Sequence, residues 1–142
     1  MESNTSNKTH KKMIAINGDH FSNLSEFYEE ASRVLMKNVD WKVGTLDGFD
    51  DILYGGFGIF ENNDEVELTW MKSEKSKNDL GLKATREFYE RKIKQGKPFN
   101  VEMIQQQLHE LISGKGQTLF DILLEIIESH KNIELILDDV KQ

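Results

Sequence analysis

The stretch Glu-Val-Glu-Leu-Thr-Trp-Met at residues 65–71 decides how this chain folds, because apolar and polar residues alternate along it. Successive side chains of an extended chain point to opposite faces, so this alternation predicts a β-strand with one buried face. The residues expected on the buried face are Val66, Leu68 and Trp70.

Two further apolar runs predict strands, residues 13–16, which end at Asn17-Gly18, and residues 133–137. Helical periodicity and capping residues, among them Asn23 and Thr45, predict helices between the strands. These helices span about residues 24–36, 45–54, 74–80, 84–95, 101–112 and 119–130. Strands separated by helices pair in parallel, so we expect an α/β fold with a small three-stranded parallel sheet covered by helices.

The length of 142 residues and the hydrophobic content of 37% suit one domain with a single core. We assign this domain to residues 13–142 and interpret the polar residues 1–12 as a flexible N-terminal tail. The sequence has no cysteine and no apolar run near the roughly 20 residues needed to cross a bilayer. We therefore expect a cytoplasmic protein without a membrane partner.

Negative charge is concentrated in one segment. Residues 40–67 contain eight carboxylates and one basic residue, Lys42, and this local balance of −7 equals the net charge of the whole protein. Such a local field predicts a positively charged partner and argues against direct binding of nucleic acid. The eight acids are Asp40, Asp47, Asp50, Asp51, Glu61, Asp64, Glu65 and Glu67.

The predicted helix at residues 45–54 places its acids on one face. At 100° per residue, Leu46, Phe49, Ile52 and Leu53 form an apolar stripe, and the opposite strip carries Asp47, Asp50, Asp51 and Tyr54. This strip is compatible with a solvated helix face, with a divalent-cation site, or with a recognition helix whose carboxylates imitate phosphates. Phe57, just beyond the helix, is a candidate apolar anchor beside the acids.

Residues 41–55 resemble the barstar family of bacterial ribonuclease inhibitors. Leu46, Asp47, Asp51, Leu53 and Gly55 match the family pattern in register. The similarity continues, in the same order, through residues 16–18, 66–76 and 119–137.

The resemblance implies a barstar-like α/β fold and inhibition of a secreted basic ribonuclease, which protects the producing cell from its own toxin. Asp51 resembles the central carboxylate that occupies the phosphate pocket of the nuclease, and Asp47 resembles its supporting acidic contact. Trp41 stands near the aromatic contact of the family, and Glu125 falls where the family places a peripheral acid.

The sequence also departs from the family pattern. Val43-Gly44-Thr45 replaces Gly-x-Asn, and Asp50 stands where better-known members carry an aromatic residue. About thirty extra residues, roughly 82–115, form a helical insertion before the last helix. The insertion is either a surface elaboration or a hairpin that makes new contacts.

An enzyme would need a nucleophile with a base, or a metal cage. The histidines at positions 10, 20, 109 and 130 show no partner spacing such as HExxH, so we expect them to be solvated or capping residues. Our hypothesis is a non-catalytic immunity protein, monomeric when free, that binds a nuclease toxin without cofactor or metal. A regulatory adaptor with another protein partner and a metal-dependent enzyme using the Asp cluster are the alternatives.

Overall fold

A three-stranded parallel sheet forms the centre of the protein, as the sequence predicts. The structure is a computed structural model that describes residues 11–36, 42–54 and 64–139. Strands β1 (Lys12–Asn17), β2 (Val66–Met71) and β3 (Ile133–Asp138) lie in the order β1-β2-β3. All pairing is parallel, and Leu68 of the central strand is in register with Ile14 and Leu135.

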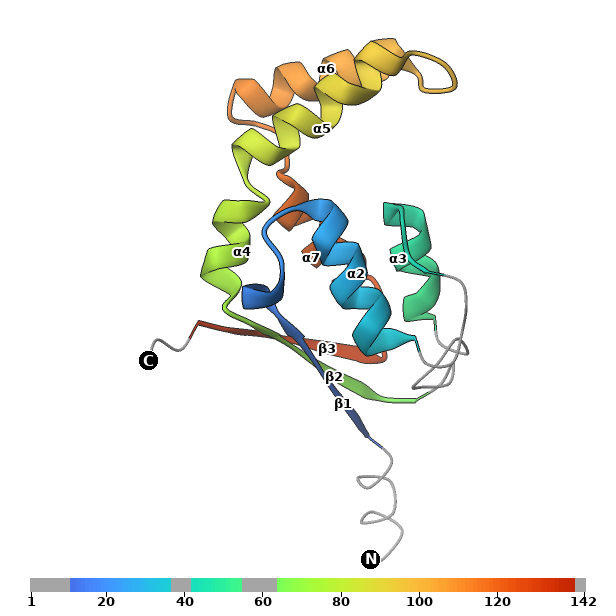
Figure 1. Ribbon diagram of the computed structural model, residues 1–142, viewed down its shortest axis with the longest axis vertical. Helices are drawn as coiled ribbons and strands as arrows, with labels where there is room; N and C mark the ends of the chain where they lie inside the picture. Colours follow the sequence, from blue (N-terminus) through green and yellow to red (C-terminus); the bar gives the residue numbers. More distant parts are fainter. Residues whose placement is uncertain (1–10, 37–41, 55–63, 140–142) are drawn as a thin grey trace, which may run out of the picture.

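Six α-helices and one short 3-10 helix connect the strands within the described ranges. The 3-10 helix η1 spans Gly18–His20 and directly follows β1. The α-helices are α2 (Leu24–Leu35), α3 (Leu46–Leu53), α4 (Ser73–Asp79), α5 (Leu82–Gln95), α6 (Val101–Ile112) and α7 (Leu119–Glu128). Figure 1 shows α2, α3 and α7 on the same side of the sheet.

The core lies between the sheet and these helices. The indole of Trp70 is fully buried at its centre, stacks on Phe27 at a centroid distance of 5.4 Å and meets the edge of Phe120 at 5.3 Å. Its Nε1 donates a hydrogen bond to Ser76 Oγ at 2.9 Å, so the one polar atom of the ring is satisfied. The alternating pattern of β2 thus correctly predicts which of its faces is buried.

Helices α5 and α6 occupy the segment that the sequence analysis interprets as an insertion. They pack against each other around a small cluster of Tyr89, Ile104 and Leu111, separate from the main core. Figure 1 shows this hairpin projecting away from the sheet. The Thr85 hydroxyl anchors its base, donating to Gly81 O at 2.7 Å and accepting from Leu119 N at 2.7 Å.

The N-terminal boundary differs slightly from the expected one. Residues 1–10 of the predicted tail lie outside the described residues, but Lys12 already belongs to β1. Lys11 Nζ lies 3.2 Å from Glu134 Oε1 of β3, which joins the start of the domain to the far edge of the sheet. No helix of the described ranges is long and apolar enough to span a bilayer.

Candidate functional site

Helix α3 is held on the core by its apolar face. Thr45 caps the helix by accepting a hydrogen bond from Gly48 N at 2.9 Å, which satisfies one of the free amides of the first turn. Phe49, Ile52 and Leu53 are each at most 2% exposed. Because this face is buried along its length, the opposite face is presented in a fixed orientation.

That opposite face carries two exposed carboxylates. Asp47 and Asp51, one turn apart, are both exposed, as is Tyr54. Within the described part of the chain, no side chain hydrogen-bonds or ion-pairs with either carboxylate. The structure therefore places Asp47, Asp51 and Tyr54 on the exposed side of α3, where the helical periodicity predicts them.

Asp50 is different, because it is bound from within the protein. His130 Nε2 lies 2.7 Å from Asp50 Oδ1, the imidazole is only 4% exposed, and the carboxylate is 38% exposed. The imidazole also packs against the ring of Tyr54, at a centroid distance of 4.6 Å and an interplanar angle of 75°. The prediction that the histidines are solvated or capping residues is thus wrong for His130, which follows α7 and is buried against α3.

A second histidine also has an internal partner. His20 Nδ1 lies 3.0 Å from Glu30 Oε1, whose side chain is almost completely buried on α2, while the imidazole itself stays half-exposed. Neither pair obeys a short sequence spacing, because each joins residues from different elements. The sequence spacing therefore does not identify which residues pair.

Glu125 lies on α7, which packs against α3, and its side chain is exposed. Its Oε1 accepts a hydrogen bond from Gln117 Nε2 at 2.9 Å. The remaining candidates for partner contact, Trp41 and Phe57, lie outside the described residues, as do Asp40 and Glu61. Among the described residues, the exposed acids of α3 are thus Asp47 and Asp51, and Asp50 is only partly exposed.

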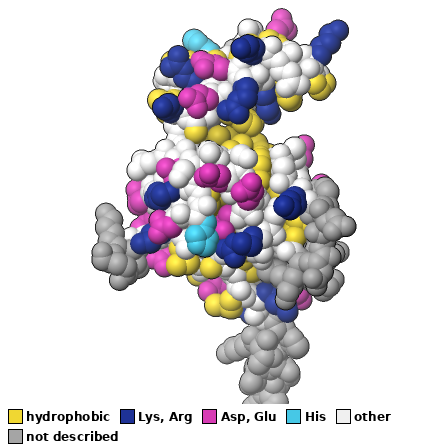
Figure 2. Space-filling view, viewed as in Figure 1, with side chains coloured by type: hydrophobic (Ala, Val, Ile, Leu, Met, Phe, Trp, Pro, Cys, Tyr) yellow, Lys and Arg dark blue, Asp and Glu magenta, His cyan; other side chains and the backbone are white. Residues whose placement is uncertain are grey.

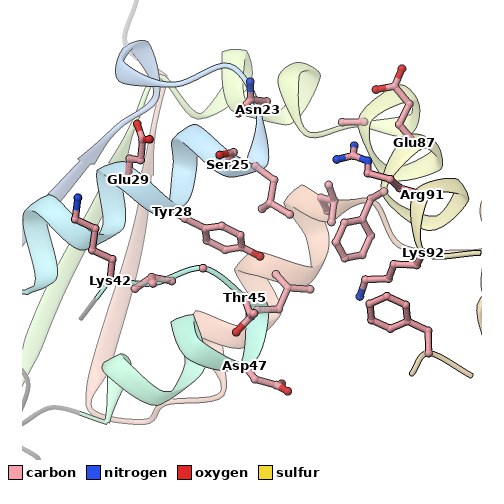
Figure 3. Close-up of a pocket in the computed structure, with 18 residues that line it drawn as sticks. Asn23, Ser25, Tyr28, Glu29, Lys42, Thr45, Asp47, Glu87, Arg91 and Lys92 are labelled. Atoms are coloured by element: carbon pink, nitrogen blue, oxygen red, sulfur yellow. The ribbon is translucent and has the colours of Figure 1, made fainter. Parts of the chain in front are cut away.

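A groove opens beside the first turn of α3, and no sequence pattern predicts it. It has a volume of about 1040 Å³. One wall is formed by α2 and residues 42–47, which belong to the part of the protein built around the sheet, here called the body, and the other wall is formed by α5 of the hairpin. Figure 3 shows Tyr28 of α2 and Lys92 of α5 reaching into it from opposite walls, with Asp47 nearby. Asp47 therefore belongs both to the acidic face of α3 and to the lining of this groove.

The described residues offer no group of three or more histidine, aspartate or glutamate side chains placed to hold a metal ion. The aspartates of α3 line up along a helix face and do not converge on one point. Comparison of the chain with protein-family models, with curated proteins and with solved structures found no match.

Proposed function

We propose that this protein is a non-catalytic inhibitor of a basic ribonuclease toxin and that α3 enters the cleft of the nuclease. The observation that carries the proposal is the pair of exposed carboxylates, Asp47 and Asp51, on a helix whose other face is buried at Phe49, Ile52 and Leu53. Neither carboxylate has a hydrogen-bond or ion-pair partner among the described residues. A partner that supplies positive charge would therefore find both acids available.

A ribonuclease provides the matching surface. Its cleft must hold Lys, Arg and His to bind the RNA backbone and to stabilise the charge that develops during cleavage. Two carboxylates one helical turn apart can occupy such a cleft without offering a bond that the enzyme could cut. Association should be accelerated by long-range attraction and slowed by salt, because the charges on both partners are exposed before they meet.

Asp50 would contribute indirectly. Its hydrogen bond to His130 ties the middle of α3 to the end of α7, so binding need not also fix the orientation of the helix. In this proposal Asp51 is the central contact and Asp47 the supporting one. Tyr54 and Glu125 are peripheral contacts, and Trp41 and Phe57 complete the surface.

The resemblance to the barstar family is the second support. The observed order of strands and helices is compatible with a barstar-like fold, which remains part of the proposal. We place the inhibitor in the cytoplasm of the cell that makes the toxin, as a monomer before it binds. The α5–α6 hairpin would then be an addition to that fold.

The decisive experiment is a binding titration against a panel of secreted bacterial ribonucleases, including any encoded beside this gene. Asp51→Ala should weaken binding at least about tenfold, because it leaves cationic groups of the cleft unpaired. Glu102→Ala is the matched control, since Glu102 is an exposed acid on α6 of the projecting hairpin. It should leave the affinity unchanged.

Raising the salt concentration should reduce the association rate of the wild type more than that of Asp51→Ala. Equal weakening by the two substitutions would contradict the proposal, since a diffuse charge effect would not distinguish α3 from α6. Absence of binding to every nuclease, with retained binding to another protein, would favour the adaptor function instead.

A further inference from the structure

The groove between the body and α5 adjoins the exposed face of α3, with which it shares Asp47, and has the properties of a binding site. Its volume of about 1040 Å³ is at the upper end for small-molecule sites. Figure 2 shows apolar side chains at the surface where the hairpin meets the body. The groove exists because α5 stands away from α2 and from the segment that precedes α3.

Two hydrogen-bond donors converge on the centre of this groove. Figure 3 shows the Tyr28 hydroxyl and the Lys92 ammonium directed toward one another from opposite walls. Among the described residues, neither group has a hydrogen-bond partner, and no carboxylate lies within ion-pair distance of Lys92. Two convergent donors that lack hydrogen-bond partners among the described residues are suited to an anion.

Burial and the charge of Asp47 both act on the pKa values of Tyr28 and Lys92. Burial raises the pKa of Tyr28 to about 12, with a further contribution from the negative charge of Asp47, so the hydroxyl remains a donor at neutral pH. Burial lowers the pKa of Lys92, and the charge of Asp47 opposes that shift. Asp47 thus favours the charged ammonium without neutralising it by direct contact.

The remainder of the lining is largely apolar and partly aromatic. Lys92 Nζ lies over the ring of Phe88 at 4.3 Å and over that of Phe99 at 5.0 Å, both measured to the centroid, so the cation is held by rings and not by an acid. The lining also includes five other charged side chains. Glu29 and Glu87 have carboxylates that point away from the centre of the groove in Figure 3, and the others are Lys42, Asp47 and Arg91. The Lys92 ammonium is therefore the cation that faces the aromatic part of the lining, and the charge of Asp47 is near enough to act on it.

We propose that this groove binds a small amphipathic organic anion. Its acid group would lie between the Lys92 ammonium and the Tyr28 hydroxyl, and its apolar ring or chain would pack against Phe88 and Phe99. The site is independent of the proposed nuclease inhibition, although Asp47 borders both surfaces.

The experiment compares two fluorescent probes that differ in charge. The anion 8-anilinonaphthalene-1-sulfonate carries an apolar ring system and an acid group, and N-phenyl-1-naphthylamine has the same rings without the sulfonate. Wild-type protein should bind one molecule of the anionic probe saturably. Lys92→Met should weaken this binding about tenfold, because a charge-assisted hydrogen bond is lost while an unbranched apolar side chain, one atom shorter, remains.

Tyr28→Phe, which removes only the hydroxyl, should weaken binding of the anionic probe by a smaller factor, and Lys92→Arg should retain it. Lys94→Met is the matched control, since Lys94 is an exposed lysine of the same helix outside the groove lining. Binding of the neutral probe should be the same in all variants, which also shows that the apolar walls are intact.

Three results would overturn the proposal: no saturable binding of the anionic probe, equal losses in Lys92→Met and Lys94→Met, or equal losses of both probes in Lys92→Met. Failure of nuclease binding would leave this result unaffected. The two proposals are thus tested separately.

Discussion

His130 Nε2 lies 2.7 Å from Asp50 Oδ1, and this contact joins two residues that are 80 positions apart in the chain. The imidazole is buried against the ring of Tyr54, just beyond the C-terminal end of α7. The pair therefore connects the acidic helix to the last helix of the fold. Asp50, which the sequence places among the exposed acids, is mainly a structural residue in this arrangement.

We expect Asp50→Ala and His130→Ala to be coupled in a double-mutant cycle. Each single substitution removes the same hydrogen bond, so their costs should not add, and the coupling energy should be about 1–2 kcal/mol. The measurement is the free energy of unfolding in urea for the wild type, the two single variants and the double variant. Asp51→Ala is the control and should change stability by less than about 0.5 kcal/mol. Additive costs for Asp50 and His130 would show that the contact does not stabilise the protein.

Ser76→Ala should destabilise the core although it removes only one oxygen atom. The Ser76 hydroxyl accepts the hydrogen bond of the fully buried Trp70 indole, and without it this N–H has no partner. An unsatisfied buried donor costs about 1–3 kcal/mol. Urea unfolding measures the loss, and Ser25→Ala, at an exposed position of α2, serves as the control with little expected change. A neutral result for Ser76→Ala would mean that the indole finds another acceptor.

Gly18→Ala and Gly44→Ala should differ in their effect on the stability of the fold. A Cβ at Gly18 would lie 2.7 Å from both Lys72 O and Ser76 Oγ, whereas nothing lies within 4 Å of a Cβ at Gly44. The first substitution should cost about 1–3 kcal/mol through overpacking. The second should be neutral or slightly stabilising, because alanine restricts the unfolded chain. Thermal unfolding of the two variants compares them directly, and equal melting temperatures would contradict this expectation.

Most of the fold could be predicted from local patterns. Alternation identified β2 and its buried face, and the caps Asn23 and Thr45 correctly marked the starts of α2 and α3. These features depend on neighbouring residues, which a sequence displays directly. The same logic placed Asp47 and Asp51 on the exposed side of α3.

The features that were missed depend on how distant elements dock. The Asp50–His130 contact and the groove between Tyr28 and Lys92 arise only when α7 and α5 are placed against the body. Glu30 did carry a local signal, because it lies three residues after the buried Phe27 on the apolar face of α2. A carboxylate at such a position indicates a buried ion with internal partners.

Glu30 should make the stability of the protein depend on pH below neutrality. Its side chain is 2% exposed and accepts hydrogen bonds from Asn17 N at 2.9 Å, from Arg33 Nη2 at 2.9 Å and from His20 Nδ1 at 3.0 Å. Burial by itself would raise the pKa of Glu30, but these hydrogen bonds and the charge of Arg33 outweigh burial and lower it below the ordinary value of 4.5.

Because the folded state holds the proton of Glu30 less tightly than the unfolded state, this residue stabilises the fold above its ordinary pKa. That contribution should be lost as the pH falls from 4.5 through the lower pKa of the folded protein. Glu30→Gln should therefore destabilise the protein by about 1–3 kcal/mol at pH 7 and by progressively less at acidic pH. Urea unfolding between pH 7 and about pH 3 measures the difference. Glu29→Gln, at the exposed neighbouring position, should follow the wild-type curve. A constant difference in the free energy of unfolding between wild type and Glu30→Gln across this pH range would show that the titration of Glu30 is not linked to folding.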